Sequence, residues 1–69
     1  MKISARNMFK GKVMKVTAGP VNAEVIVELP GGTQIVSMIT YTSVDTLGLK
    51  EGMEVYAVVK ASQVMIAVD

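Results

Sequence analysis

Short runs in which apolar residues occupy every second position recur along the chain, and this pattern most constrains its fold. In residues 23–29, for example, Ala, Val, Val and Leu alternate with Glu, Ile and Glu. Alternation with a period of two places one set of side chains on one face of a β-strand. Valine and isoleucine, which favour strands, make up much of these runs. The pattern therefore predicts an all-β protein.

Turn-forming residues divide the alternating runs into five expected strands. The segment Ala18-Gly19-Pro20 ends the first strand, and Pro30-Gly31-Gly32-Thr33 is typical of a hairpin turn. Gly11 lies inside the first run and indicates a β-bulge or a strong bend there. The strands are expected at about residues 7–17, 23–29, 35–40, 54–60 and 64–68.

A change of period between the third and fourth strands predicts a short helix at residues 43–49. Ser43 is its expected N-cap and Gly48 its expected C-terminal stop. Three strands, a short helix and two further strands match the order of elements in an OB-like, five-stranded Greek-key barrel. We expect residues 1–69 to form one such domain.

A chain of 69 residues buries little surface on its own and usually needs an additional stabilising feature. It contains no Cys, which excludes disulfides, and no His, while 51% of its residues are hydrophobic. Several expected strands carry apolar residues on both faces. Oligomerisation is therefore the stabilising feature that we expect.

Charge and hydropathy limit the cellular compartment and the partners that we expect for this chain. No apolar run is long enough to span a membrane, and no signal-peptide core is visible, so we expect a cytoplasmic protein. The net charge of +1 gives no bulk attraction to nucleic acid. Residues 1–15 nevertheless contain five basic residues and no acidic residue. Lys10 and Lys12 among them are expected on a solvated strand face.

Catalysis is not expected. Without His or Cys, a nucleophile would need a Ser–Lys or a carboxylate pair. Glu24 and Glu28 share a strand face but lie about 13 Å apart along it, too far for a shared proton. No glycine-rich phosphate-binding motif is present, and the acidic residues are too dispersed to ligate a metal directly. We therefore expect no catalytic cofactor.

A small tetrahedral oxyanion fits the chain better than nucleic acid. A nucleic-acid-binding OB module, the alternative function, needs stacking aromatics, and the chain has only one Phe and two Tyr. Ser4-Ala5-Arg6 and Lys60-Ala61-Ser62 each combine a cation, a hydroxyl and backbone N–H groups. In an OB barrel the first strand pairs antiparallel with the fourth, so Arg6 is expected to approach Lys60. Ser43, at a helix N-terminus, offers further donors.

The same segments resemble the molbindin (Mop) family, whose units also occur as TOBE domains of molybdate transporter ATPases and molybdate-responsive regulators. The similarity covers almost the whole chain in order. The segments that carry it are Ser4-Ala5-Arg6-Asn7, Lys10-Gly11-Lys12-Val13, Gly19-Pro20-Val21-Asn22-Ala23-Glu24-Val25, Ser43-Val44, Leu47-Gly48-Leu49, Gly52 with Glu54-Val55, and Lys60-Ala61-Ser62-Gln63-Val64.

The resemblance implies a homohexamer, a trimer of dimers, that binds and stores or buffers molybdate or tungstate at subunit interfaces in the cytoplasm. It implies an oxyanion site in the segments Ser4-Ala5-Arg6 and Lys60-Ala61-Ser62, with the hydroxyl of Ser43. It also implies a second site at Gly19, Val21 and Asn22, where Pro20 departs from the family by lacking an N–H. A purely structural assembly domain without a ligand is a further alternative.

Overall fold

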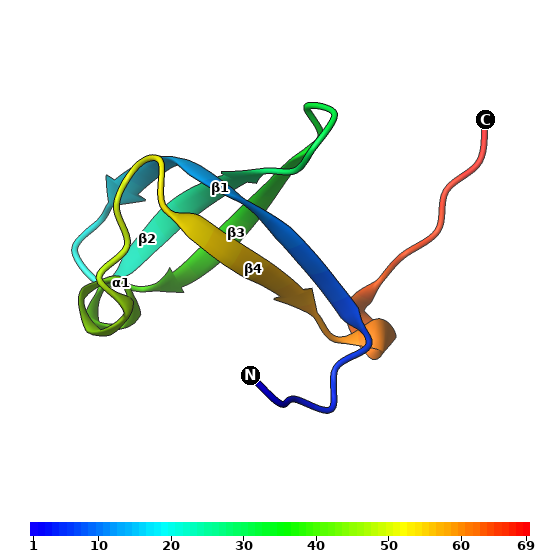
Figure 1. The fold of residues 1–69 in the computed structure, drawn as a ribbon, viewed down its shortest axis with the longest axis horizontal. Helices are drawn as coiled ribbons and strands as arrows, with labels where there is room; N and C mark the ends of the chain where they lie inside the picture. Colours follow the sequence, from blue (N-terminus) through cyan, green and yellow to red (C-terminus); the bar gives the residue numbers. More distant parts are fainter.

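The structure, a computed structural model, describes all residues 1–69 and consists mainly of one curled antiparallel sheet. The strands follow the order β3-β2-β1-β4 across the sheet. The prediction of a mostly β protein with one short helix is confirmed (Figure 1). The elements are β1 (Asn7–Ala18), β2 (Asn22–Glu28), β3 (Gln34–Thr40), α1 (Tyr41–Leu47), β4 (Glu54–Val59) and the 3-10 turn η1 (Ala61–Gln63).

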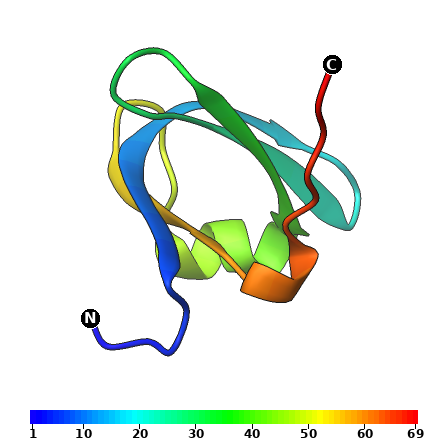
Figure 2. The same ribbon diagram turned by 90° about the vertical axis from the view of Figure 1, so that its right-hand side faces the viewer.

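Strand β1 holds the two halves of the sheet together. Its first half, Asn7–Lys12, pairs with β4, and its second half, from Lys12 onward, pairs with β2. The register with β2 shifts between Val13 and Lys15, which is the signature of a bulge. The sheet consequently curls into an open ring, as Figure 2 shows.

Gly11 allows β1 to cross close over the end of β2. A Cβ atom built on Gly11 would lie 2.6 Å from the carbonyl oxygen of Glu28 and 2.8 Å from a methyl carbon of Val27. A bulge or a strong bend was expected at Gly11. The bulge is found a few residues further on, where the register shifts between Val13 and Lys15. Gly11 is needed for close approach of two backbones.

A small core lies between β1 and β2. Val13, Val25 and Val27 are at most 4% exposed, and Ala23 is also buried. The alternation at residues 23–29 therefore corresponds to a buried face of β2, with Ala23, Val25 and Val27 turned to the core. The half-buried side chains that pack against this cluster come from all parts of the fold: Val16, Leu29, Ile39, Val44, Leu49 and Val55.

Helix α1 begins two residues earlier than predicted, because Thr40 and not Ser43 is its N-cap. Thr40 ends β3 in an extended conformation, and its Oγ1 accepts a hydrogen bond of 3.1 Å from the backbone N–H of Ser43. Ser43 lies instead within the first turn. Gly48 adopts the left-handed conformation (φ 63°) and ends the helix, as predicted.

The fifth strand expected at residues 64–68 is not formed within this chain, which contains four strands. The turn η1 directs residues 64–69 away from the sheet, so they reach no strand edge (Figure 1). No helix in the structure combines the length and the hydrophobicity that crossing a membrane requires.

Candidate functional site

The two segments predicted to bind an anion meet at one end of the sheet. Asn7, the first residue of β1, pairs with Val59, the last residue of β4. Arg6 and Lys60 are thus the next residues outward on two neighbouring strands, which run about 4.8 Å apart. Figure 1 shows η1, which follows β4, beside the start of β1. We call Ser4, Ala5, Arg6, Lys60, Ala61 and Ser62 together the basic end.

The basic end carries hydrogen-bond donors that the chain itself does not use. Neither Arg6 nor Lys60 forms an ion pair, because the single ion pair of the chain joins Lys10 to Glu54. The hydroxyls of Ser4 and Ser62 make no hydrogen bond within the chain. All of these side chains are exposed. A guanidinium, an ammonium and two hydroxyls are therefore available to a ligand.

The short turn η1 adds backbone donors to this set. The N–H groups of Gln63 and Val64 donate to the carbonyls of Lys60 (2.9 Å) and Ala61 (3.3 Å) and thereby hold the turn. The N–H groups of Ala61 and Ser62 have no backbone acceptor. These two groups belong to the first turn of η1, where helical N–H groups lack internal partners. No carboxylate joins this cluster of donors.

The other residues predicted to bind oxyanions gather at the opposite end of β1. Asn22 pairs with Thr40, and the N–H of Tyr41 donates to the carbonyl of Val21 (2.8 Å). These contacts place the start of α1, including Ser43, beside the loop that follows β1. Ser43 therefore lies with the residues of the second predicted site, not with the basic end of its own chain. We call Gly19, Val21, Asn22 and Ser43 the helix end.

The helix end offers fewer free donors than the basic end. The N–H of Gly19 donates to the carbonyl of Asn22 (2.7 Å), and Pro20 has no N–H. The N–H of Val21 has no backbone acceptor. The hydroxyl of Ser43 accepts a hydrogen bond of 2.8 Å from that of Thr40, so its own proton is free to be donated. Sequence reasoning missed Thr40, although a threonine that ends a strand three residues before Ser43 is the signal of this cap.

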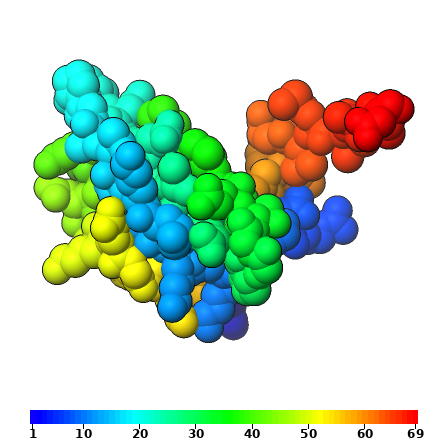
Figure 3. Space-filling view, turned by 90° about the horizontal axis from the view of Figure 1, so that it is seen from above, coloured from blue at the N-terminus to red at the C-terminus, as the bar shows by residue number.

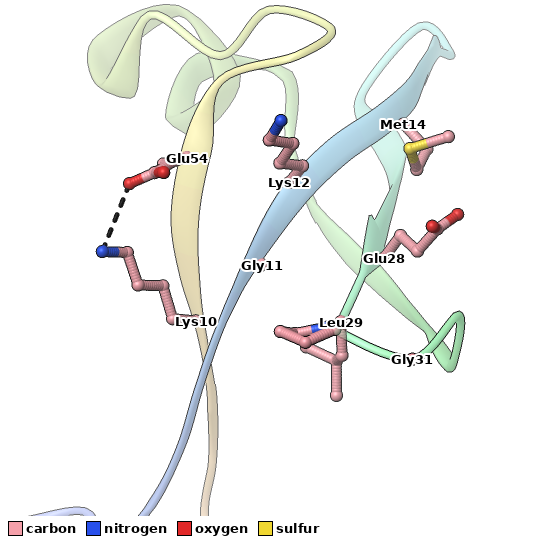
Figure 4. A pocket seen from close by; sticks show the side chains of 9 residues that line it. Lys10, Gly11, Lys12, Met14, Glu28, Leu29, Gly31 and Glu54 are labelled. Atoms are coloured by element: carbon pink, nitrogen blue, oxygen red, sulfur yellow. Dashed lines mark ion pairs between the residues drawn. The ribbon is translucent and has the colours of Figure 1, made fainter.

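Lys10 and Lys12 line a different hollow, of about 330 Å³, on the outer face of β1 beside Gly11 (Figure 4). The Nζ atom of Lys10 lies 3.3 Å from Oε2 of Glu54, and both side chains are more than half exposed. Such a pair contributes at most about 1 kcal/mol. Glu28 lines this hollow together with Glu54, and the two carboxylates would repel an anion bound there. The prediction that these two lysines lie on a solvated face is confirmed by their exposure.

The aromatic side chains are scattered over the molecule. Tyr41 lies on α1, and Phe9 and Tyr56 lie on neighbouring strands. Phe9 pairs with Ala57 while Tyr56 pairs with Lys10, so adjacent register positions place the two rings on opposite faces of the sheet. A stacking platform for nucleic acid needs aromatic rings on one face. The structure also brings together no group of three or more His, Cys, Asp or Glu residues.

Comparison with known proteins identifies the class. The family model described as the TOBE domain matches residues 3–66, and the chain belongs to this family. Within it, the chain is similar to molybdenum-pterin-binding protein 2 of Clostridium pasteurianum. The two are 54% identical over 66 residues, which cover 96% of this chain and 97% of that protein. The resemblance to the Mop family is thereby confirmed.

Solved structures of similar chains support the same family assignment. MopII from Clostridium pasteurianum matches with a TM-score of 0.93 and 52% identity, over 97% of this chain and all of that one. The cytoplasmic molybdate-binding protein ModG, in a form with molybdate bound, matches with a TM-score of 0.85 and 49% identity. That match covers 88% of this chain and 43% of the ModG chain. By their names, these relatives are binding proteins and not enzymes.

Proposed function

We propose that this protein binds molybdate or tungstate, as a tetrahedral dianion, at its basic end. The observation that carries the proposal is the position of Arg6 and Lys60 at adjacent strand ends with no acidic partner. The backbone pairing places these two cations at neighbouring positions, and an anion bound between them would offset their mutual repulsion. The molybdate that the structure of the relative ModG contains supports this choice of ligand.

The donors of the basic end suit an oxyanion chemically. A guanidinium presents a planar fork of N–H groups that can contact two oxygen atoms at once. A dianion removed from water must be paired and hydrogen-bonded, because its loss of hydration otherwise costs too much free energy. Lys60, the hydroxyls of Ser4 and Ser62, and the N–H groups of Ala61 and Ser62 supply the remaining contacts.

The proposal includes a subunit interface, because the basic end of one chain is open to solvent. A neighbouring copy that places its helix end here would join its Ser43 to Arg6, which a single chain keeps apart. The helix end, with Gly19, Val21 and Asn22, is proposed as the second oxyanion site. The assembly proposed is a homohexamer, a trimer of dimers, in which each chain forms an OB-like barrel. An anion that binds only the assembled form stabilises it by mass action.

The proposed role is storage or buffering of the oxyanion in the cytoplasm, without catalysis. Reversible binding requires only donors and an enclosed site, both of which an assembly of this chain can supply. The description of ModG as a cytoplasmic molybdate-binding protein supports the compartment.

Isothermal titration calorimetry with molybdate, tungstate and sulfate tests the proposal. Arg6→Ala should weaken molybdate binding by roughly 10-fold or more, since a hydrogen bond to a charged group contributes about 1.5–3 kcal/mol. Lys12→Ala is the matched control, because it removes one positive charge from the solvated face of β1 and should change the affinity little.

Four outcomes would contradict this assignment. Unchanged affinity in Arg6→Ala would exclude the basic end, and an equal loss in Lys12→Ala would indicate a diffuse effect of charge. An assembled protein that binds none of the three anions would favour a structural assembly domain. Salt-sensitive binding of single-stranded oligonucleotides in place of molybdate would favour the nucleic-acid-binding OB module.

A further inference from the structure

We propose that the basic end also binds the phosphate group of a planar heteroaromatic compound, whose ring lies on Met8, Tyr56 and Val58. We call these three residues the ring patch. The inference rests on the proposed function, because the phosphate would use the donors that we assign to molybdate. It adds a second class of ligand, the phosphate monoesters of ring compounds.

The ring patch lies directly beside the basic end, on the outer face of β1 and β4. Met8 pairs with Val58, and Lys10 pairs with Tyr56. Residues that lie opposite each other or two apart in a strand share a face of the sheet. Lys60 follows β4 in an extended conformation (φ −65°, ψ 128°), so it continues the face of Val58 at a distance of about 7 Å.

No other part of the chain covers the ring patch. Met8 and Val58 are each 40% exposed, and Tyr56 is 53% exposed. The hydroxyl of Tyr56 makes no hydrogen bond within the chain. Figure 3 looks onto β1, in blue, and shows no other segment lying over this strand, while residues 64–69, in red, extend away from it. The ring patch therefore offers three adjoining apolar side chains to a ligand.

The distribution of charge along this face selects a ligand with one anionic end. Arg6 and Lys60 have no acidic partner, whereas Lys10 lies 3.3 Å from Glu54. Lys12, further along β1, lies opposite Glu54 in the register. Positive charge is thus uncompensated only at the basic end. A nucleic-acid strand or an anionic membrane would extend along the face and meet the acidic side chains, but a short phosphate ester would not.

The side chains of the ring patch suit a planar ring. Tyrosine stacks on heteroaromatic rings, and the thioether of methionine makes favourable contacts with aromatic rings. A rigid ring also covers such a patch at a lower entropic cost than a flexible acyl chain, because it has fewer bonds to immobilise. The guanidinium of Arg6 can contact two phosphate oxygens at once.

Phosphate and molybdate groups would occupy the same donors, so the two ligands should exclude each other. The ring supplies contacts that free molybdate cannot make. A ring compound that carries a phosphate would therefore displace molybdate from the basic end, and the same compound without its phosphate would not.

The first experiment titrates the full chain into flavin mononucleotide, a planar ring compound with one phosphate, and follows the flavin fluorescence. Stacking on Tyr56 should quench it. Riboflavin, which lacks only the phosphate, should bind at least about 10-fold more weakly, since hydrogen bonds to a charged group are lost. Molybdate should reverse the quenching by flavin mononucleotide. Equal binding of the two flavins, or quenching that molybdate does not reverse, overturns the proposal.

The second experiment tests the ring patch by substitution. Tyr56→Ala should weaken binding of flavin mononucleotide by roughly 5-fold or more, whereas Tyr56→Phe keeps the ring and should restore most of the affinity. Met8→Ala should also weaken it, and its matched control is Met14→Ala, which removes a similarly exposed methionine from β1 outside the patch. All four variants should bind molybdate like the unmodified protein in calorimetry.

The two readouts separate this inference from the proposed function. Unchanged flavin binding in Tyr56→Ala overturns the ring patch. Loss of both ligands in Tyr56→Ala also overturns it, because the patch would then be a contact that holds the assembly together. If the unmodified protein binds flavin mononucleotide through Arg6 but binds no molybdate, the proposed function fails and the ester site stands.

Discussion

The two sides of the curled sheet differ in how deeply they bury aliphatic side chains. On the closed side, between β1 and β2, Val25 is 2% exposed. On the open side, Ile35 and Ile39 of the neighbouring strand β3, which pair with Val27 and Ala23 and share their face, are only half-buried. Val36, on the other face of β3, is 63% exposed. The closed side has a complete ladder on each strand, whereas β3 and β4 each lack a neighbour. A strand's burial is therefore decided by what covers it and not by its own hydrophobicity.

The largest effect should come from the closed side, at Gly11. Gly11→Ala should lower the free energy of unfolding by about 3 kcal/mol, because the new Cβ would lie 2.6 Å from the carbonyl oxygen of Glu28. Urea unfolding measures this change. Met14→Ala, at an exposed position of the same strand, serves as the control and should change stability little. A tolerated Gly11→Ala would mean that β1 and β2 can separate at little cost.

The paired variants Val25→Ala and Val36→Ala compare a covered position with an uncovered one on neighbouring strands. Val25→Ala should cost about 2 kcal/mol, since it removes buried methyl groups and leaves a cavity. Val36→Ala should cost less than about 0.5 kcal/mol in dilute protein, because most of its side chain remains in water. Urea midpoints at two protein concentrations check both values. A cost at Val36 that grows with concentration would show that another copy covers the open side.

A smaller effect is expected at the start of α1. Thr40→Ala removes the oxygen that accepts from the N–H of Ser43 and should cost about 1 kcal/mol. Thr40→Ser keeps this acceptor and should restore most of the loss. Thermal unfolding followed by circular dichroism compares the two variants. Equal losses in both would mean that the methyl group of Thr40, and not its hydroxyl, stabilises the helix.

Most of the fold could be predicted from local signals in the sequence. Alternation placed β1 to β4, and Gly48 marked the end of the helix because its left-handed conformation suits glycine. The N-cap was misplaced because Thr40 and Ser43 are both good caps, and only the end of β3 distinguishes them. The prediction of a fifth strand at residues 64–68 did not hold within the single chain for a different reason. A strand needs a partner edge, and residues 64–69 reach none in their own chain.

Only the part of the candidate site that depends on strand pairing could be predicted from the sequence. Antiparallel pairing of β1 with β4 brought Arg6 next to Lys60, as the order of elements implied. The position of Ser43 could not be obtained in this way, because it depends on which end of the sheet β3 reaches. The resemblance groups Ser43 with Arg6, whereas the single chain separates them, and only the assembly that we propose would bring them together.

The division of β1 between two partners also determines the order in which the fold can form. The ladders of β1 with β2 and of β2 with β3 join residues close in sequence, so their loops close at little entropic cost. The ladder of β1 with β4 must bring residue 7 to residue 59, and contacts of such long range form slowly. We therefore expect the β1–β4 ladder to close last. Arg6 and Lys60 meet only at the final step, so no folding intermediate that lacks this ladder contains the candidate site.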